Sequence, residues 1–250
     1  MNERDGLAVG GIELKRRWLF WGSIIMVLAF VTLASAKWLI SWHTGQSWHT
    51  PLAGRVIVLD AGHGGPDGGA VGGSIEEKDI TLKITKDIRN YLQEMGAVVI
   101  MTRDRDTDLA DDDFSGSHKT QDLVRRAKMV NKTHPDAFVS IHMNAIPMPS
   151  LHGAQTFYHP KSSENRKLAL FIQDSLKQNL ENTKRYAKPI GHVYLLKKAE
   201  APSALVEVGF LSNAAERALL IQPNYQKKAA ASISQGIMRY FTNEKIPSDQ

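Results

Sequence analysis

The chain has 250 residues, of which 42% are hydrophobic, and this composition suits one α/β domain of about 190 residues after an N-terminal segment. It contains no cysteine, which excludes disulfide bonds and thiolate zinc sites. The formal net charge is +5, but the basic residues do not form a stripe interleaved with aromatic residues, so we expect no nucleic-acid partner.

The first 40 residues predict a segment that directs the chain to a membrane. Three basic residues at 15–17 precede an apolar, uncharged run of 19 residues at 18–36, which is close to the length that spans a bilayer. The sequence Ala-Ser-Ala at 34–36 resembles a signal-peptide cleavage site, but the apolar character continues to residue 40. We favour a retained anchor over 18–40, with a signal peptide as the alternative. In both cases residues 1–17 form a cytoplasmic basic flank, and the chain that follows the membrane segment is extracytoplasmic.

A polar linker at 41–54 leads to a domain that we expect over 55–241, followed by a polar tail at 242–250. Within the domain, short apolar runs alternate with amphipathic stretches. Strands are predicted at 55–59, 97–102, 137–142, 153–158, 192–196 and 204–208. Helices are predicted near 76–95, 121–133, 163–182, 214–220 and 223–241. This alternation predicts an α/β fold, a single domain with a mostly parallel twisted sheet flanked by helices on both faces.

Three of the predicted strands end at a residue that can bind a metal or move a proton. The first leads into Asp-Ala-Gly-His-Gly-Gly at 60–65, where the glycines permit a sharp turn that presents His63. The second leads into His142, and the third leads into Glu207. Active sites of open α/β sheets lie at the carboxyl ends of their strands. We therefore expect these side chains to share one site.

Each residue also has a simpler explanation. A lone histidine after a strand is more often a hydrogen-bonded structural residue than a ligand. Glu207 is harder to explain in this way, because a carboxylate within an apolar strand needs a cation or a proton. Two imidazoles and a carboxylate without cysteine suit a catalytic zinc, whose fourth position is left for water. Zinc activates that water and polarises a carbonyl group, so an amide can be attacked when a nearby carboxylate transfers the proton.

These strand-end residues and the segments around them resemble a known family, the zinc-dependent N-acetylmuramoyl-L-alanine amidases of bacterial cell-wall metabolism, also called amidase 3. Five segments in family order carry the resemblance, among them VIVLDAGHGGPDGGAVGG at 56–73, FVSIHMNA at 138–145 and SALVEVGFLSN at 203–213. The other two are EKDITL at 77–82 and VVIMTRDRDTDL at 98–109. Within the family, the chain is most similar to the germination-specific amidases of the spore cortex.

The resemblance implies roles for individual residues. His63, Glu77 and His142 match the ligands of Zn²⁺, and Glu207 matches the catalytic glutamate. Glu77 is preferred to its neighbour Glu76 because it occupies the family's Glu-Lys pair. Glu76 is then interpreted as a solvated acid in the first turn of a helix, where a negative charge is favourable.

Three further residues are expected beside the site as turn caps, ion-pair partners, or contacts to the ligands or the substrate: Asp60, Arg103 and Asn144. Some relatives carry an inserted helix after the second histidine that plugs the zinc cleft. Only ten residues separate His142 from Gly153 here, which is too short for a helix of several turns that must also return to the next strand. We therefore expect an open cleft.

The resemblance implies hydrolysis of the amide between N-acetylmuramic acid and L-alanine in peptidoglycan, at the cell wall or the spore cortex. In the cortex, this step would prepare muramic acid for conversion to muramic lactam and so support germination. A lipoprotein activates some clostridial relatives, and the sequence leaves open whether this chain needs such a partner. Two alternatives remain, a zinc peptidase that cuts within the stem peptide and a non-catalytic wall-binding protein. Glu207 argues against the second, because a binding protein does not require a proton shuttle.

Overall fold

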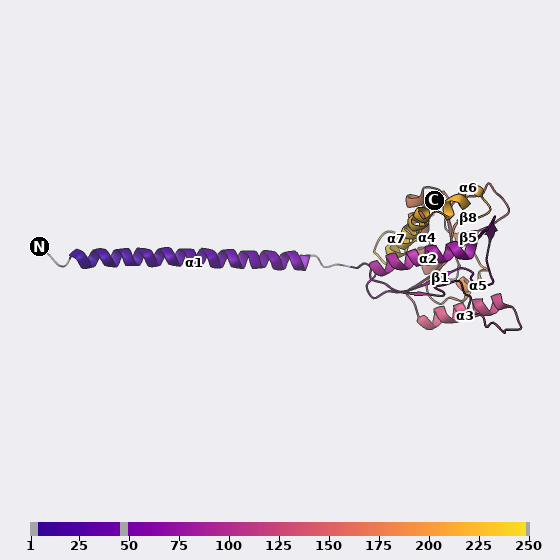
Figure 1. The fold of residues 1–250 in the computed structure, drawn as a ribbon, viewed down its shortest axis with the longest axis horizontal. Helices are drawn as coiled ribbons and strands as arrows, with labels where there is room; N and C mark the ends of the chain where they lie inside the picture. Colours follow the sequence, from indigo (N-terminus) through magenta and orange to yellow (C-terminus); the bar gives the residue numbers. More distant parts are fainter. Residues whose placement is uncertain (1–4, 46–49, 249–250) are drawn as a thin grey trace. The chain divides into compact units, whose positions relative to one another are not determined.

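The computed structural model describes residues 5–45 and 50–248, and the chain divides after His49 into two units. The described part of the first unit is one helix, α1 (Asp5–Gly45) (Figure 1). Within it, Arg17–Trp38 is a stretch of 22 residues that is long and apolar enough to cross a membrane, a property that signal sequences share. Residues 1–4, 46–49 and 249–250, which belong to the expected flank, linker and tail, lie outside the described residues.

The second unit is built on a six-stranded sheet with the strand order β4-β1-β5-β8-β6-β7. Its strands are β1 (Val56–Ala61), β4 (Val98–Met101), β5 (Ala137–Asn144), β6 (Gln155–Tyr158), β7 (Lys188–Pro189) and β8 (Ser203–Phe210). Strands β4, β1, β5 and β8 run parallel, while β6 is antiparallel to β8. Most residues of β1, β5 and β8 are buried, as expected for parallel strands covered on both faces. The prediction of a mostly parallel sheet is confirmed.

Helices cover both faces of this sheet (Figure 1). One face carries α2 (Glu77–Glu94), α4 (Ser163–Leu180) and α7 (Pro223–Tyr240), and the other carries α3 (His118–Thr133) and α5 (Tyr194–Lys198). The helix α6 (Ala214–Leu220) follows β8. Ile57 and Val206 join the larger core cluster on the first face, whereas Val58 and Leu205, one position along, join the smaller cluster on the second. This alternation is the two-residue period of a strand with apolar residues on both faces.

The predicted strand at 192–196 is wrong, because most of this segment forms helix α5. Leu195 and Leu196 are adjacent and both buried against the second face of the sheet, which a helical turn permits more readily than a strand with one buried face. The sheet ends instead at the two-residue strand β7. The sequence also gave no indication of a small antiparallel pair, β2 (Val71–Gly72) and β3 (Ile75–Glu76), which is joined through Gly73 at a φ of 64°.

The carboxyl ends of β1, β5 and β8 meet at one edge of the sheet. Asp60 of β1 is paired in register with Ser140 of β5, and His142 of β5 is paired with Glu207 of β8. The pairing of β5 with β8 shifts between His142 and Asn144, where the ladder becomes irregular. The fold therefore brings together the strand-end residues that the sequence placed in one site.

Candidate metal centre

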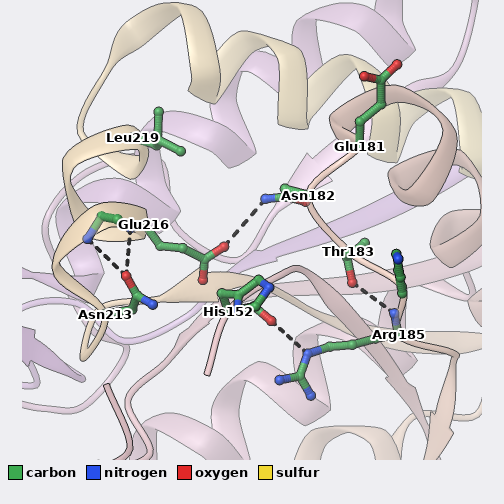
Figure 2. Close-up of a pocket in the computed structure, with 10 residues that line it drawn as sticks. His152, Glu181, Asn182, Thr183, Arg185, Asn213, Glu216 and Leu219 are labelled. Atoms are coloured by element: carbon green, nitrogen blue, oxygen red, sulfur yellow. Dashed lines mark hydrogen bonds between the residues drawn. The ribbon is translucent and has the colours of Figure 1, made fainter. Parts of the chain in front are cut away.

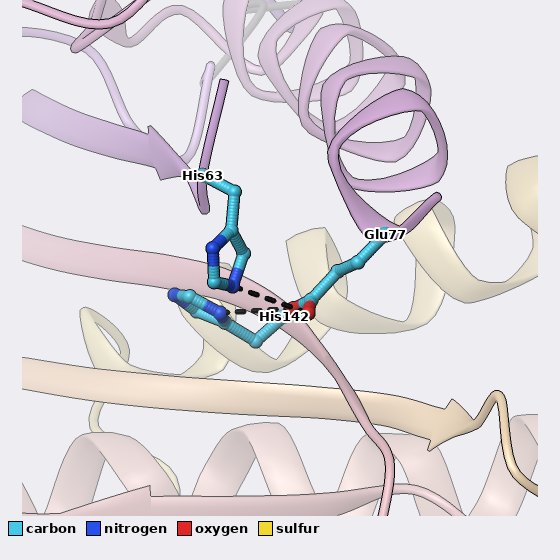
Figure 3. A group of neighbouring side chains, drawn as sticks. All are labelled: His63, Glu77 and His142. Carbon is cyan, nitrogen blue, oxygen red and sulfur yellow. Dashed lines mark hydrogen bonds and ion pairs between the residues drawn. The ribbon is translucent and has the colours of Figure 1, made fainter. Parts of the chain in front are cut away.

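Three side chains from different elements point toward one another at this edge (Figure 3). His63 comes from the loop after β1, Glu77 is the first residue of α2, and His142 lies on β5. Nε2 of His63 lies 3.1 Å from Oε2 of Glu77, and Nδ1 of His142 lies 3.0 Å from Oε1 of the same carboxylate. The potential ligand atoms of all three residues lie within 4.8 Å of one another. Two imidazoles and one carboxylate that converge in this way fit a zinc ion with one open position.

Glu77 is held in place by the backbone as well as by the histidines. Its Oε2 accepts a hydrogen bond of 2.8 Å from the N–H of Ala70, and its Oε1 accepts one of 2.8 Å from the N–H of Met143. Burial acts to raise the pKa of Glu77, but the hydrogen bonds from His142 and His63 outweigh it and hold the pKa below its usual value. The group is therefore an ionised carboxylate, which is the form that binds a metal.

Two glycines make room for this cluster. A Cβ added at Gly62 would lie 2.4 Å from Cε1 of His142. A Cβ added at Gly69 would lie 2.6 Å from Cδ2 of His63 and 2.7 Å from Oε2 of Glu77. Gly69 also has a φ of 73°, which other residues rarely adopt. The glycine-rich loop is thus required for the close packing of the cluster as well as for the turn.

His63 has a φ of 64°, unusual for a residue with a side chain, and two buried arginines hold the backbone around it. Arg103 donates to the carbonyl of Ala61 at 2.8 Å and to that of Gly62 at 2.9 Å. Arg126 donates to the carbonyl of His63 at 2.7 Å. The carbonyl groups on this stretch are therefore bound by guanidinium groups, which fixes the direction in which the imidazole of His63 points.

The charge of Arg126 is balanced by Asp60, whose Oδ1 lies 2.8 Å from Nη1 of the arginine. Asp60 also accepts hydrogen bonds from the hydroxyl groups of Thr102 and Ser140. Burial acts to raise the pKa of Asp60, but Arg126 and these hydrogen bonds lower it to about 2. Asp60 and Arg103 thus lie behind the three ligand residues. Asp60 is an ion-pair partner and Arg103 binds the backbone of the loop that carries His63, and neither side chain is one of the three potential ligands. Sequence reasoning did not identify Arg126.

Asp67 is a second supporting residue that sequence reasoning did not identify. Its Oδ2 lies 2.9 Å from Nδ1 of His63 and 3.3 Å from Nζ of Lys119. A carboxylate on one ring nitrogen of a histidine fixes the tautomer, so that the other nitrogen is free to bind a metal. Here Nε2 is that other nitrogen, and it faces Glu77. The only signal in the sequence was the position of this aspartate four residues after the histidine.

Glu207 lies beside the cluster, and one of its carboxylate oxygens has no hydrogen bond within the described part of the chain. It is paired in register with His142, yet its Oε2 is buried and has no hydrogen bond to any described residue. Burial raises the pKa of Glu207 to about 7. The negative charge of Glu77 also raises this pKa, whereas His142 and His63 lower it. A carboxylate with a pKa near neutrality can both accept and donate a proton in that range.

The remaining predictions concern residues around the cleft. Oδ1 of Asn144 accepts a hydrogen bond of 3.0 Å from the N–H of Ile146, which makes it a turn cap. Glu76 is partly exposed and lies 3.4 Å from Nζ of Lys78, but it ends β3 and is the N-cap residue of α2, one position before the first turn in which it was expected. Residues 145–152 contain no helix, so this loop has no plug of the kind some relatives carry. A cavity of about 250 Å³ reaches His63 and His142 from the side of α3 and α5.

Comparison with known proteins agrees with this geometry. Residues 57–239 match the amidase 3 family, described as N-acetylmuramoyl-L-alanine amidase. The germination-specific N-acetylmuramoyl-L-alanine amidase of Bacillus subtilis (strain 168) is 49% identical over 239 residues, which cover 94% of this chain and 99% of that protein.

Solved structures show the same relationship. The CwlD amidase from Clostridioides difficile, in complex with the GerS lipoprotein, has a TM-score of 0.73 and 38% identity, covering 74% of this chain and 98% of that one. The catalytic domain of CwlV, an N-acetylmuramoyl-L-alanine amidase from Bacillus (Paenibacillus) polymyxa var. colistinus, has a TM-score of 0.65 and 30% identity, with coverages of 74% and 97%. The resemblance found in the sequence is confirmed, and the chain belongs to the N-acetylmuramoyl-L-alanine amidase family.

Proposed function

We propose that the chain is a zinc-dependent enzyme that hydrolyses the amide between N-acetylmuramic acid and L-alanine in peptidoglycan. The observation that carries the proposal is the position of Glu207, with its unpaired buried oxygen, beside a converging His-Glu-His cluster in a member of this family. His63, Glu77 and His142 would hold the zinc. A zinc ion bound there would supply a Lewis acid and lower the pKa of a water molecule.

The protein's own residues would orient the ligands and move the proton. Glu207 would take a proton from the attacking water and return it to the alanine nitrogen as the amide breaks. Burial raises its pKa to about 7 in the metal-free protein, so the carboxyl group is able to hold a proton at this position. Asp67 would keep Nε2 of His63 directed at the metal, and the N–H groups of Ala70 and Met143 would do the same for the oxygens of Glu77.

The location and the biological setting follow from the N-terminal helix and the relatives. Arg17–Trp38 would carry the domain across the cytoplasmic membrane, as an anchor or as a cleaved signal, because cell-wall substrate lies outside. The Bacillus subtilis relative is named a germination-specific amidase, which supports action on spore cortex peptidoglycan. The CwlD amidase was solved in complex with the GerS lipoprotein, and a lipoprotein activator for this chain is part of the proposal for that reason.

The deciding experiment is mass spectrometry of cortex peptidoglycan digested with the zinc-loaded full-length protein in detergent. The expected products are muramic acid residues with a free lactyl carboxyl group and intact stem peptides that begin with L-alanine. A zinc peptidase would instead shorten the stem peptides and leave the muramoyl amide intact. A wall-binding protein would leave the masses unchanged. If the protein alone fully digests cortex, the lipoprotein activator is not required.

A further inference from the structure

The sheet places a row of polar side chains beyond Glu207, on the side away from the metal cluster. His142 is paired in register with Glu207, and Glu207 is paired in turn with Gln155 of β6. Residues paired in this way project from the same face of a sheet, with Cβ atoms about 5 Å apart. Oε1 of Gln155 then accepts a hydrogen bond of 3.3 Å from Nη1 of Arg185. The row therefore runs from His142 through Glu207 and Gln155 to Arg185.

Arg185 is held firmly in this position. Its Nε donates to the carbonyl of His152 at 2.9 Å, and its guanidinium carbon lies 5.0 Å from the centre of the Phe210 ring. Gln155 is fixed as well, because its Nε2 donates to the carbonyl of Tyr186 at 3.0 Å. Nη2 of Arg185 makes no hydrogen bond within the described residues. A planar guanidinium group with free donors and a fixed orientation is well suited to bind a carboxylate.

The surroundings of Arg185 contain room for a ligand, and the two carboxylates that line the same cavity, those of Glu181 and Glu216, form no ion pair with it within the described residues. Arg185 lines a cavity of about 890 Å³ together with His152 and Glu216 (Figure 2). The carboxylate of Glu216 is occupied by the backbone N–H groups of Gly153 and Phe210, each at 2.8 Å. Whereas Arg126 and Arg239 each pair with an acidic side chain, Arg185 has no such partner in the described part of the chain. Its charge is therefore available to a ligand.

The proposed reaction sets the position of the scissile nitrogen relative to this row. Glu207 would return the proton to the alanine nitrogen, so the scissile nitrogen must lie at Glu207. In the arrangement that we consider, the peptide that continues from this nitrogen runs along the row of side chains, past Gln155. An extended chain advances about 3.5 Å per residue, and neighbouring strands lie about 4.8 Å apart. On this path, the residue after L-alanine is the one that comes near Arg185, which contacts Gln155.

We propose that Arg185, supported by Gln155 and His152, binds the free carboxylate of the second stem-peptide residue and selects peptides that carry it. The proposal rests on the proposed amidase function, because that reaction sets the position of the scissile nitrogen. It makes Arg185 a specificity residue for the leaving-group side of the amide. Stem peptides provide this carboxylate when their second residue, a glutamate, continues the chain through its side chain.

The test uses two substrates that differ in one group: N-acetylmuramoyl-L-alanyl-D-glutamic acid, and the same compound with the α-carboxylate converted to an amide. The zinc-loaded full-length protein is assayed in detergent, and kcat/KM is measured for each substrate. The wild type should favour the acid by about tenfold, the scale of a charge-assisted hydrogen bond of about 1.4 kcal/mol. Arg185→Gln should reduce this ratio to near one, and Arg185→Lys should restore part of it.

Lys184→Gln is the matched control, because it removes a neighbouring positive charge that lines the same cavity and should leave the ratio unchanged. Thermal unfolding of each variant shows that the fold is kept. The proposal is overturned if Arg185→Gln retains the preference for the acid, or if it lowers activity on both substrates equally, since that result indicates a structural role. It is also overturned if the wild type cleaves both substrates equally well.

A second measurement uses the peptide product alone, which has no muramoyl amide to cleave. The dipeptide L-alanyl-D-glutamic acid and its α-amide are compared as inhibitors of cortex digestion. The acid should inhibit the wild-type enzyme about tenfold better than the amide does, whereas the two compounds should inhibit Arg185→Gln equally. If the two compounds inhibit the wild type equally, the proposal is overturned. If cortex itself is not cleaved at the muramoyl amide, the amidase function fails instead, so the two failures are distinguishable.

Discussion

Replacing Glu207 by glutamine tests both its unpaired state and its catalytic role. The pKa of Glu207 rises from the ordinary 4.5 to about 7 in the folded protein, a difference of about 2.5. Each pKa unit corresponds to about 1.4 kcal/mol, so the ionised carboxylate lowers the free energy of unfolding by about 3 kcal/mol. Glutamine has nearly the same shape and no charge. In the metal-free protein, Glu207→Gln should therefore be more stable than the wild type at high pH.

The sign follows from proton binding. Because the pKa is higher in the folded state, destabilisation by the carboxylate is absent below pH 4.5, grows as the pH rises to about 7, and is then constant. Urea unfolding of the metal-free proteins at pH 4, 6 and 8 should thus show that the free energy of unfolding of Glu207→Gln exceeds that of the wild type by an amount that increases with pH to about 3 kcal/mol. Glu76→Gln is the control, because this acid is partly exposed and faces Lys78; the change should stay within about 1 kcal/mol at each pH.

The zinc-loaded form of the same variant tests the proton shuttle. Glu207 is not among the proposed ligands, so Glu207→Gln should retain its zinc while turnover falls by at least about a hundredfold, the scale of general acid–base catalysis. Turnover near that of the wild type would show that another group moves the proton. Loss of stability at pH 8 in the metal-free protein would refute the conclusion that the carboxylate is buried without a partner.

Three other predictions use the same protein. His63→Ala and His142→Ala should each lower the zinc content measured by atomic emission, and stoichiometric zinc in both variants would contradict the ligand assignment. Shortening residues 146–152 to a tight turn should not increase turnover, whereas a large increase would show that this loop blocks the cleft. When residues 17–38 are present, a reporter fused to the C-terminus should be found on the outer side of the cytoplasmic membrane. A reporter that is found in the cytoplasm would refute the export prediction.

The sequence was most informative where a site residue lies near the end of an apolar run. The runs at 137–142 and 204–208 were correctly assigned as strands, which places His142 and Glu207 near the carboxyl ends of β5 and β8, although these strands continue to Asn144 and Phe210. The run at 192–196 was assigned wrongly, because a short apolar segment can be buried as one helical turn or as a strand. Tertiary packing against the sheet decides between the two, and that packing is not encoded locally.

The support behind the cluster could not be predicted for a different physical reason. Arg126 and Asp60 are separated by 66 positions in the chain, and nothing in the helix pattern distinguishes buried Arg126 from the partly exposed arginine beside it at position 125. Its burial becomes necessary only once the loop around His63 adopts its unusual backbone and exposes a carbonyl group that must be bound. The need for Arg126 is thus created by the fold.

The order of strands in the sheet explains why substrate recognition extends beyond the family motifs. In space, β5 carries a proposed metal ligand, β8 carries the proposed proton shuttle, and β6 lies next to it, although β6 precedes β8 in the chain. Because β6 is antiparallel to β8, its first residue, Gln155, lies opposite Glu207 at the end where the parallel strands finish. A residue that begins a strand therefore occupies the same edge as residues that end strands. Motifs along the chain miss this position. The strand register places Gln155 opposite Glu207, and the hydrogen bond from Arg185 to Gln155 places Arg185 beside it, on the proposed path of the substrate.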